Sequence, residues 1–218
     1  MNKAWSELNK TMQAQVKKKD TYEAGIDTLF DLRNQLMETL TSFNEELSRE
    51  EFDAIPFINA DGYHSKTIAY SIWHIFRIED IVAHTLIGED EQVFFAGNYQ
   101  ERINSPIITT GNELVKEQIA DFSKQLNLKE LYAYIFEVKD STEKIIDSLS
   151  YDDLKKKISE ERKEYLKSLN VVSNDENAIW LIDYWCGKDI RGLIQMPFSR
   201  HWIMHIEASQ RIKNRIHS

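Results

Sequence analysis

The chain has 218 residues, 42% of them hydrophobic, which is enough for one well-buried domain, and no Gly- or Pro-rich linker divides it. With only 7 Gly and 3 Pro, the composition favours an all-α architecture with few tight turns. The formal net charge of −9 argues against recognition of a phosphate backbone, which needs a concentrated positive field, so nucleic acid is not an expected partner.

The cysteine content and the hydropathy of the chain indicate the cellular compartment in which the protein is expected. The single cysteine, Cys186, excludes an intramolecular disulfide framework and a zinc site built from several thiolates. The start of the chain is polar and lacks the apolar region of a signal peptide, and no apolar run reaches the roughly 18 residues of a membrane span. We therefore expect a cytoplasmic protein that does not interact with membranes.

The first predicted elements are a lead segment and a long helix. Residues 1–19 form a Lys-rich, weakly amphipathic lead that either packs on the domain or frays. From Asp20, which can act as an N-cap, to about residue 48, apolar residues recur every three or four positions. This pattern predicts a long core helix.

A second helix is predicted between Ser65, a candidate cap, and Gly88, a natural stop. It is apolar on nearly every side, as expected of a central helix covered by neighbours. His74 lies within it, and hydroxyl groups are unusually common on the same face: Thr67, Tyr70, Ser71 and Thr85. A water-filled site next to His74 would explain them.

The segment 88–112 has no clear periodicity but contains Phe94, Phe95 and Tyr99. Loops longer than about 12–15 residues inside a compact domain are usually functional or disordered, and the aromatic residues argue against disorder. We interpret the segment as a crossover that partly lids the site.

A short helix is predicted over 113–124, and Asn127 can cap a third long helix that ends near residue 149. The long joining piece that follows contains two further helical patterns, 152–169 and 174–186. The second pattern carries a dense aromatic run, which either walls one end of the bundle or builds the contact of a homodimer.

The last predicted helix begins at Pro197 and continues to about residue 216. His201 and His205 are four positions apart, so both imidazoles stack on one helix face, with Cβ atoms about 5–6 Å apart. This face is apolar and should look into the core. Trp202 stands where HExxH metalloproteases keep their glutamate base, which excludes that protease class. An isolated pair of this kind can also be two hydrogen-bonded histidines at the edge of a core.

Two histidines hold a metal weakly, and His74 is the expected third ligand. The segments SIWHIFRIED, around His74, and RHWIMHIEA, around His201 and His205, resemble the DinB/YfiT-like superfamily of metalloenzymes. That family is a four-helix bundle with one ligand histidine in its second helix and an HxxxH pair in its last. The resemblance covers residues 21–216.

The resemblance implies a fold and a site. The fold would be an all-α, DinB-like four-helix bundle in a single domain over 1–218, with a long crossover between helices 2 and 3 and accessory helices. The site would hold a divalent metal ion, zinc or nickel, on His74, His201 and His205. A fourth coordination position left to water is typical of catalytic zinc sites.

The family also implies a reaction. Its members include thiol-dependent S-transferases and a maleylpyruvate isomerase, so thiol transfer on a small-molecule substrate, with a low-molecular-weight thiol as cosubstrate, is the leading hypothesis. Hydrolysis is the runner-up, because a bound divalent ion can activate either a thiol or water. The alternative from a different class is a non-catalytic, metal- or ligand-binding stress-response protein.

Further residues have candidate roles beside plainer ones. Tyr70, one turn before His74, is the candidate catalytic residue, as a donor to bound water or substrate; otherwise it is an ordinary bundle tyrosine. Glu79 and Glu207 either accept hydrogen bonds from ligand imidazoles or are solvated helix charges.

For five other residues the sequence supports weaker expectations. His64 and His84 point away from the face of His74 on an ideal helix and are expected at the surface. Arg200 could bind a substrate carboxylate or pair with Asp183. Cys186 is expected to be a small buried residue or a bystander at a helix end.

Overall fold

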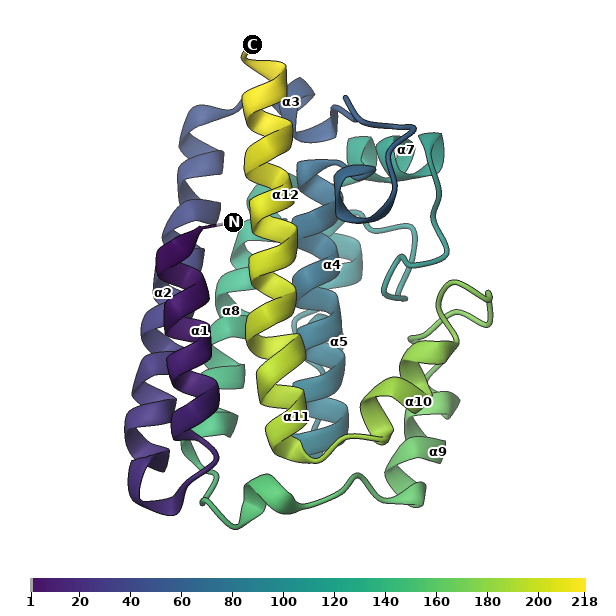
Figure 1. Ribbon diagram of the computed structural model, residues 1–218. Coiled ribbons are helices and arrows are strands. Elements are labelled where there is room, and N and C mark those ends of the chain that lie inside the picture. The colour runs from purple at the N-terminus through teal and green to yellow at the C-terminus, as the bar shows by residue number, and fades with distance from the viewer. Residues whose placement is uncertain (1) are drawn as a thin grey trace.

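The computed structural model describes residues 2–218, and these residues contain no β-strand, only an isolated bridge between Lys157 and Asp189. The prediction of an all-α protein is confirmed. Four long helical segments run along the same axis (Figure 1). Their bounds are α2 (Tyr22–Glu46), α4 (Ile68–Asp80) with the π-helical continuation η3 (Ile81–Gly88), α8 (Leu128–Asp147), and α12 (His201–Ile216), preceded by α11 (Ile190–Gln195) and the π-helical turn η5 (Met196–Arg200).

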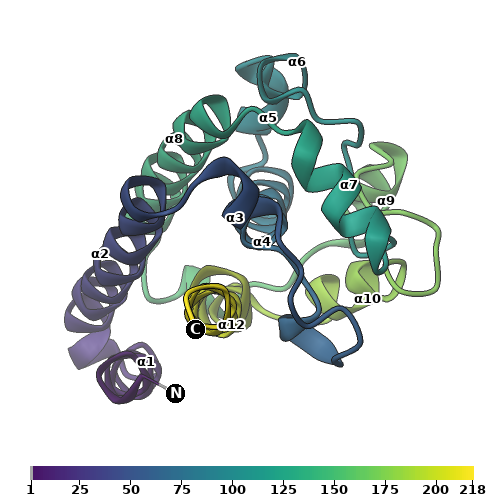
Figure 2. The same ribbon diagram turned by 90° about the horizontal axis from the view of Figure 1, so that it is seen from above.

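Shorter helices connect or cover these segments. They are α1 (Lys3–Gln15), η1 (Lys19–Thr21), α3 (Arg49–Asp53), η2 (Gly62–His64), α5 (Val93–Ala96), α6 (Tyr99–Ile103), α7 (Glu117–Gln125), η4 (Asp153–Lys155), α9 (Glu160–Ser168) and α10 (Trp180–Cys186). Seen from above, α2 and α8 form one side and α7, α9 and α10 the opposite side, with α4 and α12 between them (Figure 2). No helix within residues 2–218 combines the length and apolarity needed to cross a membrane.

The helix α4 is central, as predicted. Every one of its residues is buried, and it contacts α8, α12, α3 and α7. Its cap is Thr67, whose Oγ1 accepts a hydrogen bond from the Tyr70 amide at 3.0 Å, and not Ser65, which stays in the preceding turn. The continuous segment does end at Gly88, as predicted, but the left-handed residue that follows is Glu89 (φ 58°).

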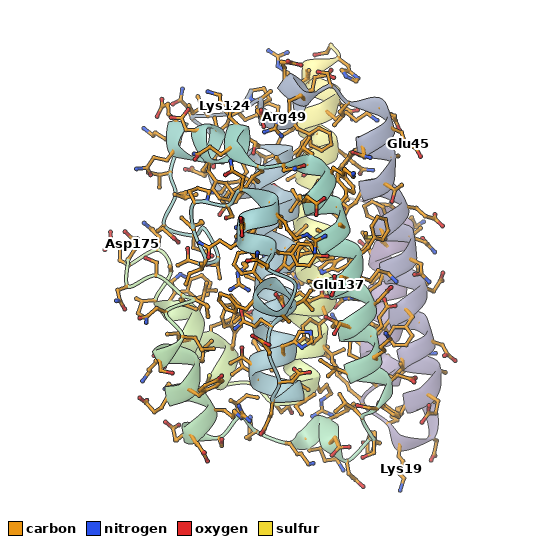
Figure 3. The ribbon with its side chains drawn as sticks, turned by 180° about the vertical axis from the view of Figure 1, so that it is seen from behind. Lys19, Glu45, Arg49, Lys124, Glu137 and Asp175 are labelled. Atoms are coloured by element: carbon orange, nitrogen blue, oxygen red, sulfur yellow. The ribbon has the colours of Figure 1, made fainter. Side chains whose placement is uncertain are left out.

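The lead segment packs and does not fray. Trp5, Met12 and Val16 of this segment are buried, and α1 lies along α2 (Figure 1). Asp20 sits within the 3₁₀ turn η1 and does not cap α2, so that prediction is wrong. Figure 3 shows how far α2 reaches, with the labelled Lys19 and Glu45 at opposite ends of the molecule.

The crossover after Gly88 is more regular than predicted, because it contains α5 and α6. The Asp80 carboxylate accepts hydrogen bonds from the Val93 and Phe94 amides at 2.8 and 2.9 Å, which fixes the start of α5. Phe94 and Tyr99 are buried in the main core. These two aromatic residues fill the core, and a later part of the crossover, at Thr110, reaches the site. That the segment 88–112 partly lids the site stays a prediction.

Several helix starts differ from prediction. Helix α7 starts at Glu117, α9 at Glu160 and α10 at Trp180, each later than expected. The last helical segment starts earlier, at Ile190, where Asp189 accepts a hydrogen bond from the Gly192 amide at 2.8 Å. Pro197 therefore lies inside a helical segment, where proline normally clashes with the preceding turn. The backbone departs from α-helical angles just before it, and a π-turn joins α11 to α12.

Candidate metal centre

The structure brings the three predicted histidines together. His74 comes from α4, and His201 and His205 from the first turns of α12. The ring centroids of His74 lie 5.1 Å from His201 and 4.8 Å from His205, and the rings of the α12 pair lie 4.7 Å apart. One nitrogen from each ring lies within 4.8 Å of the other two, and all three side chains are buried. The cluster could hold a metal ion.

The backbone at the end of the crossover fixes the orientation of His74. Its Nδ1 lies 2.7 Å from the Thr110 carbonyl oxygen. Because a carbonyl can only accept, Nδ1 carries the proton and the Nε2 lone pair is free, the arrangement that metal-binding histidines usually have. Gly111 makes this possible: its φ is +75°, and a Cβ there would lie 3.0 Å from the Tyr70 ring.

Burial keeps the cluster uncharged. Desolvation lowers the pKa of His74 to about 4, and the Thr110 carbonyl only partly opposes this. Desolvation also lowers the pKa values of His201 and His205 well below their usual range, with a smaller contribution from the neighbouring imidazoles. All three rings are therefore neutral near pH 7, the protonation state that a metal ion requires of its ligands.

The donor set fits a divalent ion. The Nδ1 atoms of His201 and His205 are buried and have no hydrogen-bond partner within residues 2–218. An unpaired buried polar atom is costly, and a metal ligand bond is one way to satisfy it. Tetrahedral zinc with Zn–N bonds of about 2.0–2.1 Å needs nitrogens about 3.4 Å apart, so ligand nitrogens that lie up to 4.8 Å apart would have to approach one another by up to about 1.4 Å.

A cavity of about 220 Å³ opens beside the cluster. Its lining consists of Tyr63, His74, Ile78, Asn112, Trp180, Leu181, Tyr184, Trp185, Met196, Pro197, His201 and His205. Among these described residues there is no Asp, Glu, Lys or Arg. The cavity therefore offers imidazoles, phenols and one amide for chemistry, with mostly aromatic and aliphatic walls.

Tyr70, the candidate catalytic residue, lies next to the cluster but outside this lining. Its ring stacks on His74, with centroids 5.4 Å apart and an interplanar angle of 11°. Its hydroxyl donates to the Gly111 carbonyl at 2.9 Å, and burial strongly raises its pKa. The hydroxyl holds the crossover in place and does not point at the imidazoles.

Of the lining residues, only the three histidines were predicted as site residues, and four of the others bear on its chemistry. Tyr63 packs its ring edge to face against His205 at 4.7 Å, and burial raises the pKa of its hydroxyl. Asn112 follows the turn that bonds His74. Trp180 and Tyr184 belong to the aromatic run, which was predicted to wall one end of the bundle or to build a homodimer contact; in the structure these two side chains line the cavity. The turn before α4 and the aromatic run were the available signals, but neither pattern says which histidine it will face.

Both glutamates proposed as imidazole partners bind elsewhere. Glu79 is fully buried and pairs with Arg33 at 2.7 Å, and it accepts a hydrogen bond from Trp202 Nε1 at 2.8 Å. Glu207 is also buried and accepts a hydrogen bond from the Asn2 amide. Neither glutamate touches an imidazole and neither is solvated. Both predicted roles, imidazole partner and solvated helix charge, are therefore wrong. The missing information was the position of α1 and α2.

Two further corrections concern polar side chains. His84 is buried and not at the surface, with Nδ1 2.7 Å from Asp90 and Nε2 3.0 Å from Ser141. Its segment is π-helical, and the extra residue per turn changes the face that an ideal α-helix assigns to it. Asp183 pairs with Lys163 at 2.8 Å, so the predicted pairing with Arg200 is wrong.

His64 is only partly buried and accepts a hydrogen bond from Arg211, which supports its exclusion from the cluster. Cys186 lies at the end of α10, where burial raises the pKa of its thiol to about 11, so it is not a reactive thiolate near pH 7.

Comparison with known proteins adds no family assignment. No family model matches the chain, and no curated protein matches it. The chemical reading of the site rests on its own residues: the three histidines, the carbonyl that orients one of them, and the cavity beside them.

Proposed function

We propose that this protein is a metal-dependent enzyme of the DinB/YfiT type that acts on a small molecule. The observation that carries the proposal is the buried cluster of three neutral imidazoles facing a cavity of about 220 Å³. A closed structural zinc site normally uses four protein ligands, so a three-ligand set beside a cavity favours catalysis over a purely structural role. The four long helical segments, with the crossover between η3 and α8, support the bundle topology of that family.

The residues have distinct parts in this proposal. His74, His201 and His205 hold the ion, and the Thr110 carbonyl fixes the tautomer of His74. A bound divalent ion supplies Lewis-acid chemistry, which lowers the pKa of a thiol or a water molecule. Tyr63 remains protonated near pH 7, because burial raises its pKa, and it can donate a hydrogen bond to the substrate. We assign no catalytic step to Tyr70.

Thiol transfer is favoured over hydrolysis by what the cavity contains. Its described lining has no carboxylate, the group that usually serves as general base for water or as acid for a poor leaving group. A bound ion would ionise either a thiol or a water molecule without such a base, so the missing carboxylate counts against hydrolysis through the leaving group, which needs an acid that thiol addition to an electrophile does not. The low-molecular-weight thiol and the cytoplasmic location belong to this proposal. The homodimer stays a prediction. It was suggested by the aromatic run of α10, and two side chains of that run line the cavity.

The lack of a carboxylate also favours the second candidate, a metal- or ligand-binding protein without turnover. The two candidates differ in a simple assay. Metal-loaded protein is incubated with a low-molecular-weight thiol and an electrophile, and loss of free thiol is followed. Catalytic loss above the metal-free control supports the enzyme; tight metal binding without turnover of thiols or activated esters supports the binding protein.

The test of the site itself is metal content. We expect close to one divalent ion per chain after mild purification, measured by elemental analysis, and its loss in His74→Ala. His217→Ala is a matched control, because this histidine is exposed at the C-terminus and pairs with Glu51. Metal below about a tenth of an ion per chain, with no uptake of added zinc or nickel, would count decisively against the proposal.

A further inference from the structure

The cavity beside the histidine cluster has an aromatic wall that the metal does not require. Trp180 and Tyr184 come from α10, and their rings touch edge to face at 5.5 Å. Tyr63 contributes a third ring, from the turn before α4. Trp180 is 50% exposed and Tyr63 37% exposed, unusual for large aromatic side chains, and both line this one cavity. Exposed aromatic residues that gather at one opening mark a binding site.

The volume sets the size of the occupant. A dry cavity of about 150 Å³ accepts benzene, whereas drug-sized ligands occupy about 300–1,000 Å³. At about 220 Å³, this cavity holds one ring with a small substituent. A bulkier cosubstrate has to reach the cluster from the mouth.

The lysines nearest the wall lie outside the cavity. Lys163 pairs with Asp183, and the Lys188 ammonium lies 4.1 Å from the centroid of the Tyr184 ring; neither lysine lines the cavity. A charge on a ligand ring inside the cavity would lose hydration without gaining a charged partner from the described lining, which is costly.

We propose that the cavity binds an uncharged aromatic ring packed against Trp180 and Tyr184, with a metal-ligating head group directed at the histidine cluster. This rests on the proposed function, since the head group needs the ion. It makes the substrate a small aryl compound, and it makes the two α10 rings specificity-determining residues. Aromatic rings prefer the edge-to-face and offset packing that such a wall offers.

Hydroxamates test the ring separately from the metal. Titration calorimetry of the zinc-loaded full chain compares benzohydroxamate with acetohydroxamate, which has the same head group and no ring. We expect benzohydroxamate to bind about ten times more tightly. Its 4-carboxy derivative, whose charge would face α10, should lose this advantage.

Substitutions in α10 then test where the aromatic ring of the hydroxamate binds. Trp180→Ala and Tyr184→Ala should bring the two hydroxamates to similar affinity without changing zinc content, because neither side chain touches an imidazole and neither is fully buried. Tyr165→Ala is the matched control, an exposed aromatic on α9 outside this cavity, and should keep the preference.

The outcomes separate the two ideas. Absence of zinc uptake removes the proposed function and this inference with it. Normal zinc uptake with equal affinity for both hydroxamates overturns the aromatic site alone. A preference that survives both α10 substitutions, or tight binding of the carboxylated ring, overturns it as well.

Discussion

Two buried polar clusters lie side by side along α4 and α12, and they differ in how completely the protein satisfies them. The first, which we call the arginine cluster, consists of Arg33, Glu79, Glu143 and Trp202. Arg33 donates to both Glu79 oxygens at 2.7 and 3.0 Å, to Glu143 at 2.9 Å and to the Phe198 carbonyl at 3.0 Å. Trp202 donates to Glu79 as well. Lys139 supplies a second positive charge, 2.8 Å from Glu143, so each charge has its counter-charge within the fold.

The second, the histidine cluster of His74, His201 and His205, has one internal partner, the Thr110 carbonyl. His201 and Trp202 are neighbours in sequence, yet one faces the incomplete cluster and the other the complete one. Burial of polar side chains therefore does not by itself define a ligand site. The arginine cluster ties α2, α4 and α12 together without external help, whereas the histidine cluster has nitrogens left for a ligand.

The largest effect is expected from breaking the complete cluster. Glu79→Ala leaves the buried Arg33 guanidinium without its main counter-charge, and breaking buried pairs of this kind costs about 3–5 kcal/mol. Urea unfolding of the metal-free protein at pH 7 measures the loss. Asp121→Ala is the control, because its pair with Lys124 is exposed, and its effect should stay below about 1 kcal/mol.

The same experiment with His74→Ala sharpens the comparison. In metal-free protein this change should cost less than Glu79→Ala, because it removes no counter-charge. An equal cost would mean that the histidine cluster contributes as much to folding stability as the arginine cluster does.

Acid should weaken the histidine cluster through the pKa of its imidazoles. In the unfolded chain His74 has its ordinary pKa of about 6.5, and in the folded state about 4. Its contribution to stability is complete above about pH 6.5 and is lost as the pH falls toward 4, because only the unfolded chain takes up the proton. The loss is about 3 kcal/mol for this residue, and His201 and His205 act in the same direction.

Urea unfolding with a chelator at pH 7 and pH 5 checks this prediction. His74→Ala should show a smaller difference between the two pH values than the native sequence. Equal stability of the native sequence at both pH values would show that the imidazoles are not held neutral by burial.

The sequence predicted the site correctly where the position of a residue depends only on which face of one helix it occupies. The i, i+4 spacing placed His201 and His205 together, and the apolar character of α4 predicted its central position. Caps were harder, since Ser65 and Thr67 offer the same hydroxyl and only packing selects one. The two π-helical segments have no comparable sequence signal. Because one of them contains His84, the prediction that His84 lies at the surface was wrong. Partners far apart in sequence were also out of reach, because no local pattern links Arg33 to Glu79.

Binding of a metal ion at the histidine cluster should stabilise the folded protein, because it provides partners for the unpaired imidazole nitrogens. A ligand that binds only the native state at about a hundred times its Kd adds roughly 2.7 kcal/mol. For a domain of this size that corresponds to a rise in Tm of about 5–10 °C. His74→Ala and His205→Ala should each remove most of the shift, whereas His217→Ala should keep it. If His74→Ala kept the full shift, the ion would belong to the α12 pair alone and the three-histidine site would have to be abandoned.

The smallest effect is expected from Tyr70→Phe, and it tests whether Tyr70 acts in chemistry or in support. The change removes the hydrogen bond from the hydroxyl to the Gly111 carbonyl but keeps the ring stacked on His74. A net loss of about 1 kcal/mol in unfolding free energy is expected, with little change in metal affinity. Tyr132→Phe is the matched control: its buried hydroxyl donates to the Leu40 carbonyl at 2.7 Å, away from the cavity, and it should lose a similar amount. Thiol-transfer activity should fall no further in Tyr70→Phe than in Tyr132→Phe, because the Tyr70 hydroxyl does not reach the cavity. A much larger drop in activity, at unchanged stability and metal content, would show that the Tyr70 hydroxyl takes part in catalysis.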